Sequence, residues 1–182
     1  MGTLKTTNIQ SISGSGTVTL GTSGETFTVP SGVTLTNSGT TTGFNNPAFH
    51  VYETSSQTVT TNTYTKATLD EELYDSNNNF ASSRFTPTVA GKYFIYGNMH
   101  LDGSSYPTYT ETAIYKNGSA IARNFTAQSS ANIYGNKVIS TTVDMNGSSD
   151  YVELWGKVTQ GGTCSFVGGQ KDKFFGGYRI GT

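Results

Sequence analysis

The sequence predicts an all-β protein, and three observations support this prediction. Stretches of β-branched and aromatic residues recur at intervals of about ten residues, separated by Gly, Asn and Ser, as in sheets of short strands. Charged residues make up only 13% of the 182 residues, which excludes a coiled coil or a long helix. No segment places apolar residues at the helical spacing of three and four. A series of such strands predicts an antiparallel sandwich or jelly roll.

A change of composition near Phe44 predicts two domains, an arm at 1–43 and a globular head at 44–182. Thr, Ser and Gly dominate the arm, in which Lys5 and Glu25 are the only charged residues. The head holds most of the aromatic residues and the only Trp. The head is therefore expected to contain the hydrophobic core.

The arm carries short pieces with strand-like alternation, namely Thr17–Leu20, Glu25–Val29 and Val33–Thr36. Each piece has a single apolar stripe, and isolated short strands are marginal in water. We therefore expect a Thr/Ser/Gly-rich β arm whose stripes are buried when several copies wind together. The alternative is a flexible linker of the same composition.

In the head, β-branched and aromatic runs define the expected strands, and turn dipeptides separate them. Asn117-Gly118 predicts a type I′ hairpin turn, and Asn146-Gly147 predicts a second turn. Leu69–Leu73 could form one helical turn at most. The expected strands are Ala48–Tyr52, Thr58–Leu69, Lys92–Leu101, Thr110–Lys116, Ala120–Phe125, Asn136–Asp144, Tyr151–Lys157 and Phe174–Ile180.

Four stretches of the head follow one recognisable order. Phe80 and Arg84–Phe94 contain Phe-Thr-Pro-Thr followed by Gly-Lys-Tyr-Phe, and Tyr115–Ile121 contains an Asn-Gly hairpin. Val143–Leu154 ends in Asp-Tyr-Val-Glu-Leu, and Phe174–Ile180 reads Phe-Phe-Gly-Gly-Tyr-Arg-Ile. Together these motifs resemble the globular head of the complement recognition subunit, which shares its jelly roll with tumour necrosis factor.

The resemblance covers roughly residues 48–182 and implies a jelly-roll sandwich of about ten strands that assembles as a homotrimer. The sequence departs from the pattern where two serines separate Gly147 from Asp150. Some relatives bind calcium, but no ligand set can be mapped onto this chain, so no cofactor is predicted. In the arm, Leu20–Thr34 is similar to N-terminal segments of marine bacteriophage fibre proteins.

No catalytic or metal site can be assembled from the motifs. His50 and His100 are the only histidines, which is too few for a histidine zinc site. Cys164 is expected to fill a strand position as a small apolar residue. The cluster Asp70–Glu72 could bind a cation or supply a glycosidase acid pair, but neighbouring side chains diverge, and a solvated loop is favoured. Lys171–Lys173 is interpreted as a hairpin tip.

Three tyrosines in polar, loop-like surroundings are the candidate ligand contacts: Tyr106, Tyr109 and Tyr134. An exposed Tyr ring offers rigid contact area with a polar tip, which suits a sugar or a protein surface. The aromatic residues on expected strands are interpreted as core or subunit-interface residues; they are Tyr93, Phe94, Tyr96, Tyr151 and Trp155.

Composition also limits the partners. A formal net charge of −1 gives no basic excess for nucleic-acid binding, and no apolar run is long enough to insert in a membrane. The N-terminus shows no basic and then apolar secretory pattern. We expect synthesis in the host cytoplasm.

These observations predict a non-enzymatic, trimeric fibre or appendage of a bacteriophage virion. Residues 1–43 would attach to other virion proteins, and the head would adhere to a glycan or protein on the host surface. Three alternatives stay open: a capsid or neck fibre without receptor contact, a polysaccharide-degrading tip enzyme, and a cellular complement-like binding module.

Overall fold

The computed structural model describes residues 26, 28–34, 46–103, 107–127 and 135–181. The chain divides into two units, 1–43 and 44–182. The described residues of the first unit form a turn rather than a strand: the Val33 amide donates to the Pro30 carbonyl (3.2 Å), and Gly32 has a φ of 82°. The expected arm strand Thr17–Leu20 lies outside the described residues. The described parts of Glu25–Val29 and Val33–Thr36 are not in a strand.

Thirteen β-strands and no helix make up the described part of the second unit. The strands are β1 (Ala48–Tyr52), β2 (Gln57–Val59), β3 (Thr65–Lys66), β4 (Glu71–Asp75), β5 (Phe80–Ala81), β6 (Arg84–Phe85), β7 (Gly91–Gly103), β8 (Tyr109–Lys116), β9 (Ser119–Ala127), β10 (Gly135–Met145), β11 (Val152–Thr159), β12 (Cys164–Phe166) and β13 (Lys173–Gly181).

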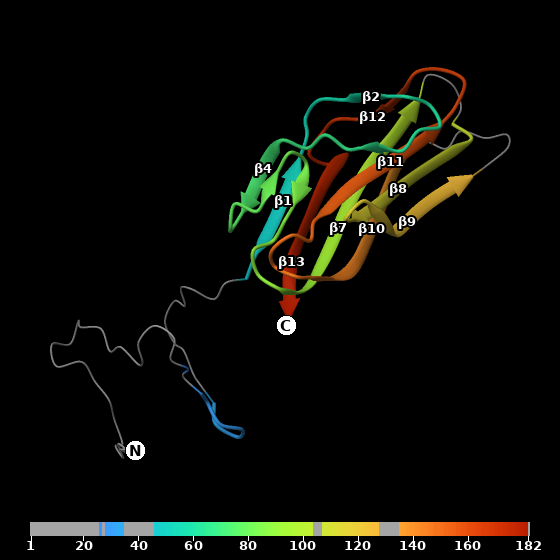
Figure 1. The fold of residues 1–182 in the computed structure, drawn as a ribbon. Helices are drawn as coiled ribbons and strands as arrows, with labels where there is room; N and C mark the ends of the chain where they lie inside the picture. The colour runs from blue at the N-terminus through green and yellow to red at the C-terminus, as the bar shows by residue number, and fades with distance from the viewer. Residues whose placement is uncertain (1–25, 27, 35–45, 104–106, 128–134, 182) are drawn as a thin grey trace, which may run out of the picture. The chain divides into compact units, whose positions relative to one another are not determined.

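The strands form two antiparallel sheets that pack as a sandwich (Figure 1). Sheet A has the order β2-β12-β7-β13-β1-β4, and β10 also pairs with β7. Sheet B has the order β5-β6-β11-β8-β9, and β3 also pairs with β11. Neighbours such as β1 and β13 are far apart in sequence, so the fold depends on long-range pairing.

The core lies between the sheets because strand residues alternate between two faces. In β7, Tyr93 and Ile95 point inward and are fully buried, as are Ile114 of β8 and Leu154 of β11. Aromatic rings close one end of this core, where Phe49 stacks on Phe85 with 4.1 Å between centroids and meets Phe175 edge-on. An all-β jelly-roll sandwich is therefore confirmed.

Most expected strands match observed ones within a few residues, but Thr58–Leu69 was wrong as a single strand. A turn with Asn62 at a φ of 58° divides it into β2 and β3. Leu69–Leu73 is not a helical turn either, because β4 pairs with β1 there. Cys164 is buried in β12, as expected.

The predicted hairpin between β8 and β9 is confirmed, since Asn117 and Gly118 have φ values of 50° and 80°. A Cβ on Gly118 would find only the Tyr151 hydroxyl, 3.9 Å away, so Gly118→Ala tests backbone strain rather than a clash. We expect a loss of about 1 kcal/mol, because Ala disfavours positive φ, and a fall in Tm of about 2–4 °C. Thermal denaturation followed by circular dichroism measures it.

Gly161→Ala is the matched control, since Gly161 also has open space around its Cα but no positive φ. Its melting temperature should stay at the wild-type value. Equal effects of the two substitutions would contradict the type I′ assignment.

Candidate functional site

The outward side of sheet A is an aromatic face. Side chains that alternate away from the core on β7 meet partners in register on β13, as in the pair Phe94 and Tyr178. On the other side of β13, His50 of β1 lies opposite Gly176 and pairs across to Tyr74 of β4. We define the aromatic face by seven residues: His50, Tyr52, Tyr74, Phe94, Tyr96, Phe174 and Tyr178.

Gly176 gives these rings room to lie flat against the sheet. A Cβ at Gly176 would come within 2.5 Å of the Tyr96 ring, so Tyr96 lies over the glycine and reaches the next strand. There its hydroxyl is 3.0 Å from His50 Nδ1. His50 also stacks on Phe174, with 5.4 Å between ring centroids. Several rings on this face therefore support one another directly.

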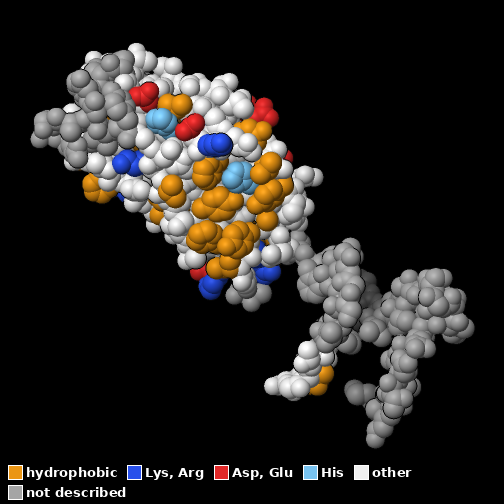
Figure 2. All heavy atoms as spheres, turned by 180° about the vertical axis from the view of Figure 1, so that it is seen from behind, with side chains coloured by type: hydrophobic (Ala, Val, Ile, Leu, Met, Phe, Trp, Pro, Cys, Tyr) orange, Lys and Arg blue, Asp and Glu red, His pale blue; other side chains and the backbone are white. Residues whose placement is uncertain are grey.

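Much of the aromatic face is open to solvent. Tyr74 is 45% exposed and Tyr178 44%, and the exposed Val138 and Ile180 lie on strands of the same sheet. Figure 2 shows a contiguous group of hydrophobic side chains on this side, with a histidine side chain among them. A large exposed apolar patch on a soluble protein marks an interaction site.

Electrostatics on this face favour uncharged groups. Burial lowers the pKa of His50 from its ordinary value of 6.5. Burial, and then a hydrogen bond with Tyr74, raise the pKa of the Tyr96 phenol. At neutral pH both side chains are thus uncharged, which suits contact with another apolar surface.

The outward side of sheet B is built differently, around two buried glutamates. Glu111 of β8 is fully buried, and Arg123 of β9 donates from Nη2 to its Oε2 at 2.7 Å. The hydroxyls of Tyr64 (3.0 Å) and Tyr109 donate to the same oxygen. Burial alone would raise the pKa of Glu111, but these hydrogen bonds and the arginine charge lower it, so the carboxylate is ionised.

Glu153 of β11 repeats this arrangement. It is 2% exposed and accepts from Arg84 Nε at 2.9 Å, Lys66 Nζ at 3.3 Å and Trp155 Nε1 at 3.1 Å. Burial pushes its pKa upward, whereas the hydrogen bonds from Trp155 and Arg84 and the nearby Lys66 lower it. Each glutamate therefore anchors an arginine and at least one aromatic side chain on the sheet surface.

The structure changes the setting expected for the candidate tyrosines. Tyr109 is not in a loop: it begins β8, is half-buried, and stacks on Phe125 with centroids 5.8 Å apart. Tyr106 and Tyr134 lie outside the described residues. The glutamates were missed because they are separated from Arg123 and Arg84 in sequence, and only the strand register brings them together.

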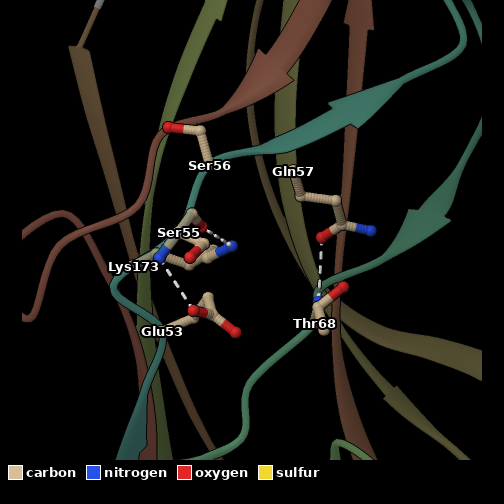
Figure 3. Close-up of a pocket in the computed structure, with 6 residues that line it drawn as sticks. All are labelled: Glu53, Ser55, Ser56, Gln57, Thr68 and Lys173. Carbon is tan, nitrogen blue, oxygen red and sulfur yellow. Dashed lines mark hydrogen bonds between the residues drawn. The ribbon is translucent and has the colours of Figure 1, made fainter.

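A polar pocket of about 220 Å³ lies beside β2 and the start of β13 (Figure 3). Lys173 lines it, fully buried, and its Nζ donates to the Ser55 carbonyl at 3.0 Å. The prediction of a hairpin tip at Lys171–Lys173 is therefore wrong for Lys173, which begins β13 and is buried. Burial lowers the pKa of Lys173, while the nearby carboxylates Glu53 and Asp70 oppose this effect.

The side chains of Asp70–Glu72 diverge, as expected. The segment is only partly a loop, because two of its residues belong to a strand. Glu71 and Glu72 begin the exposed strand β4, while Asp70 hydrogen-bonds to Glu53. That contact lowers the pKa of Glu53 and raises the pKa of Asp70. Within the described ranges, no group of three or more His, Cys, Asp or Glu is placed to hold a metal ion. In the same ranges, no helix is long and apolar enough to cross a membrane.

Comparison with known proteins supports the fold. No protein-family model and no curated protein matches the sequence. Among solved structures, murine APRIL at pH 8.5 is 8% identical, with a TM-score of 0.56 over 75% of this chain and 100% of its own.

Two further solved structures agree with this likeness. Eiger TNF from S. frugiperda is 9% identical, with a TM-score of 0.55 over 74% of this chain and 92% of its own. The globular domain of zebrafish complement 1qA is 15% identical, with a TM-score of 0.51 over 74% and 97%. The head thus has the jelly-roll fold of tumour necrosis factor and complement 1q domains.

The histidine of the aromatic face should make stability depend on pH. Because burial lowers its pKa below 6.5, the unfolded chain binds the proton more strongly, so stability falls as pH drops below 6.5. His50→Gln removes this contribution. Melting temperatures between pH 7.5 and 5.5 should therefore fall more steeply for the wild type than for the variant, and parallel slopes would contradict the assignment.

Proposed function

We propose that the protein is a non-enzymatic, trimeric fibre or appendage of a bacteriophage virion. In this proposal residues 1–43 attach to other virion proteins, and the head adheres to the host surface. The observation that carries the proposal is the aromatic face of sheet A, which a single chain leaves exposed.

Self-association is the simplest way to cover this face. Fully burying a large apolar side chain contributes about 1.5–3 kcal/mol, and several rings here are only half-buried. A second and third copy offer the same apolar chemistry. A trimer in particular fits the motifs of the head, whose resemblance to complement and tumour necrosis factor domains implies a homotrimer.

The arm supports the same stoichiometry and suggests where the protein is located. Its apolar stripes need neighbouring copies, and three arms emerging from a trimeric head would provide them. Leu20–Thr34 resembles fibre segments of marine bacteriophages, which supports a place in an external virion appendage.

A degrading tip enzyme is less favoured because of the geometry of Glu53 and Asp70. Their side chains interact with each other directly, so no substrate lies between them. Glycosidases hold their carboxylates about 5–9.5 Å apart, leaving room for the sugar and water. This pair therefore suits a structural role beside Lys173, and adhesion requires no bond-breaking step.

Light scattering on the purified chain tests the assembly. We expect a mass near three times 19.4 kDa, and Tyr178→Glu should give a folded monomer, because it places a charge within the aromatic face. Ile121→Glu is the control, since Ile121 is 40% exposed but lies on β9 of sheet B. A monomeric wild type, or a Tyr178→Glu trimer, would contradict the proposal.

Deleting residues 1–43 separates assembly from attachment. The remaining head, 44–182, should keep its β-sheet circular dichroism and its trimeric mass, because the described core lies within it. It should no longer be incorporated into virus particles, as judged by immunoblotting of purified particles. Normal incorporation would show that the arm is not the attachment segment.

A further inference from the structure

The outward side of sheet B carries a broad aromatic platform. Trp155 of β11 stacks on Tyr115 of β8 with 4.9 Å between centroids and 27° between planes. Tyr64 approaches Tyr115 at 6.4 Å, and Tyr109 stacks on Phe125, which is 58% exposed. These rings come from β8, β9 and β11 and from Tyr64, which directly precedes β3, so they form one surface across the sheet.

The polar atoms of several rings are already used beneath this surface. The hydroxyls of Tyr64 and Tyr109 bond to Glu111, and the Trp155 indole N–H bonds to Glu153. These polar atoms are therefore not free for a ligand, which meets the ring carbons that mutual stacking and Lys157 leave uncovered. Ring carbons that are fixed in this way suit apolar C–H groups rather than a hydrogen-bonding partner.

The same geometry hides negative charge and displays positive charge. Glu111 and Glu153 are buried, whereas the side chains of Lys66, Arg84 and Arg123 are 33%, 41% and 47% exposed. A molecule approaching from solvent therefore meets cations whose counter-ions lie underneath. Because the buried carboxylates also orient the arginines, the display is organised before any ligand arrives.

Lys157 adds a cation with no carboxylate partner among the described residues. Its ammonium lies 5.0 Å from the Tyr64 ring centroid and 5.4 Å from that of Tyr109. With Lys157 included, the described residues of this face carry four cations and two carboxylates. The face is thus positive on a chain whose formal net charge is −1.

We propose that this cation–aromatic face, built on Tyr64, Tyr109, Phe125, Trp155, Arg123 and Lys157, binds an acidic polysaccharide. Sugar C–H groups lie against the exposed ring carbons, and sugar carboxylates pair with Lys157 and the exposed edge of Arg123. The inference rests on the proposed adhesive function and gives it a binding surface and a ligand class.

The small positive excess and the shape of the face distinguish this ligand from a nucleic acid. Single-stranded nucleic acid carries a charge on every nucleotide and is bound along a strongly basic groove. Here the excess is small and is spread over a flat sheet with mutually stacked rings. Such a face matches a chain whose sugar rings present C–H groups beside their carboxylates. In a trimer, three weak faces would add their affinities through multivalency.

Binding of the full-length chain to polygalacturonate, measured by biolayer interferometry, tests the proposal. Methyl-esterified pectin is the matched probe, because it keeps the sugar backbone and neutralises the carboxylates. We expect binding to polygalacturonate that weakens as salt is raised, and at least a five-fold weaker response to the methyl ester, because charge-assisted hydrogen bonds are about twice as strong as neutral ones.

Two variants locate the site without leaving a buried charge unpaired. Lys157→Gln removes the cation, and Phe125→Ser removes an exposed ring; each should weaken binding about five-fold or more, as expected for the loss of a charged contact or a stacking platform. Lys171→Gln is the control, since Lys171 is an exposed lysine in the segment before β13, away from sheet B. Circular dichroism and light scattering confirm that each variant is folded and assembled.

The outcomes separate this inference from the proposed function. A trimer that ignores polygalacturonate, or one that binds both probes equally, would overturn the acidic-polysaccharide face and leave the trimer intact. Tighter binding of single-stranded oligothymidylate, lost in the same variants, would reassign the face to nucleic acid and also overturn the inference. A monomer that binds polygalacturonate through Lys157 would instead contradict the trimeric proposal and support the face.

Discussion

Strand alternation is the constraint on which the rest of the structure depends. Each strand must divide its side chains between two sides of a sheet, and the core uses only one of them. In β7 this places Tyr93 and Ile95 in the core and turns Phe94 and Tyr96 outward. A chain in which only 13% of residues are charged has few ionic groups with which to solvate its outward sides. Each sheet therefore satisfies its outer side by a different means.

Sheet B uses buried charge. An ionised carboxylate without partners would be very costly inside a protein, yet Glu111 and Glu153 each receive an arginine and further donors. Breaking such a pair costs about 3–5 kcal/mol, because it leaves one buried charge uncompensated. The glutamates thus fix the arginines and rings above them, and order at the surface follows from electrostatics below it.

The sequence predicts elements with local signals well and long-range clusters poorly. Ala48–Tyr52 and the Asn117-Gly118 turn could be predicted because their signals are local: alternation in one case and positive φ in the other. Strands β5, β6 and β12 have two or three residues each, too few for a periodic pattern. The burial of Lys173 and the pairing of Glu111 with Arg123 depend on strand register between distant segments, which composition and spacing do not determine.

The outward sides of sheets A and B can bind different partners because they lie on opposite sides of the sandwich. Sheets A and B pack through a shared core, so their outward sides point in opposite directions. An assembly that covers the aromatic face of sheet A with other copies leaves the outward side of sheet B facing solvent in every copy. A partner for that side must meet exposed Arg123 and half-buried Lys157 together with fixed rings, while the carboxylates stay beneath. The sandwich thus separates two surfaces. The apolar surface on sheet A suits self-association, and the cationic surface on sheet B suits a foreign ligand.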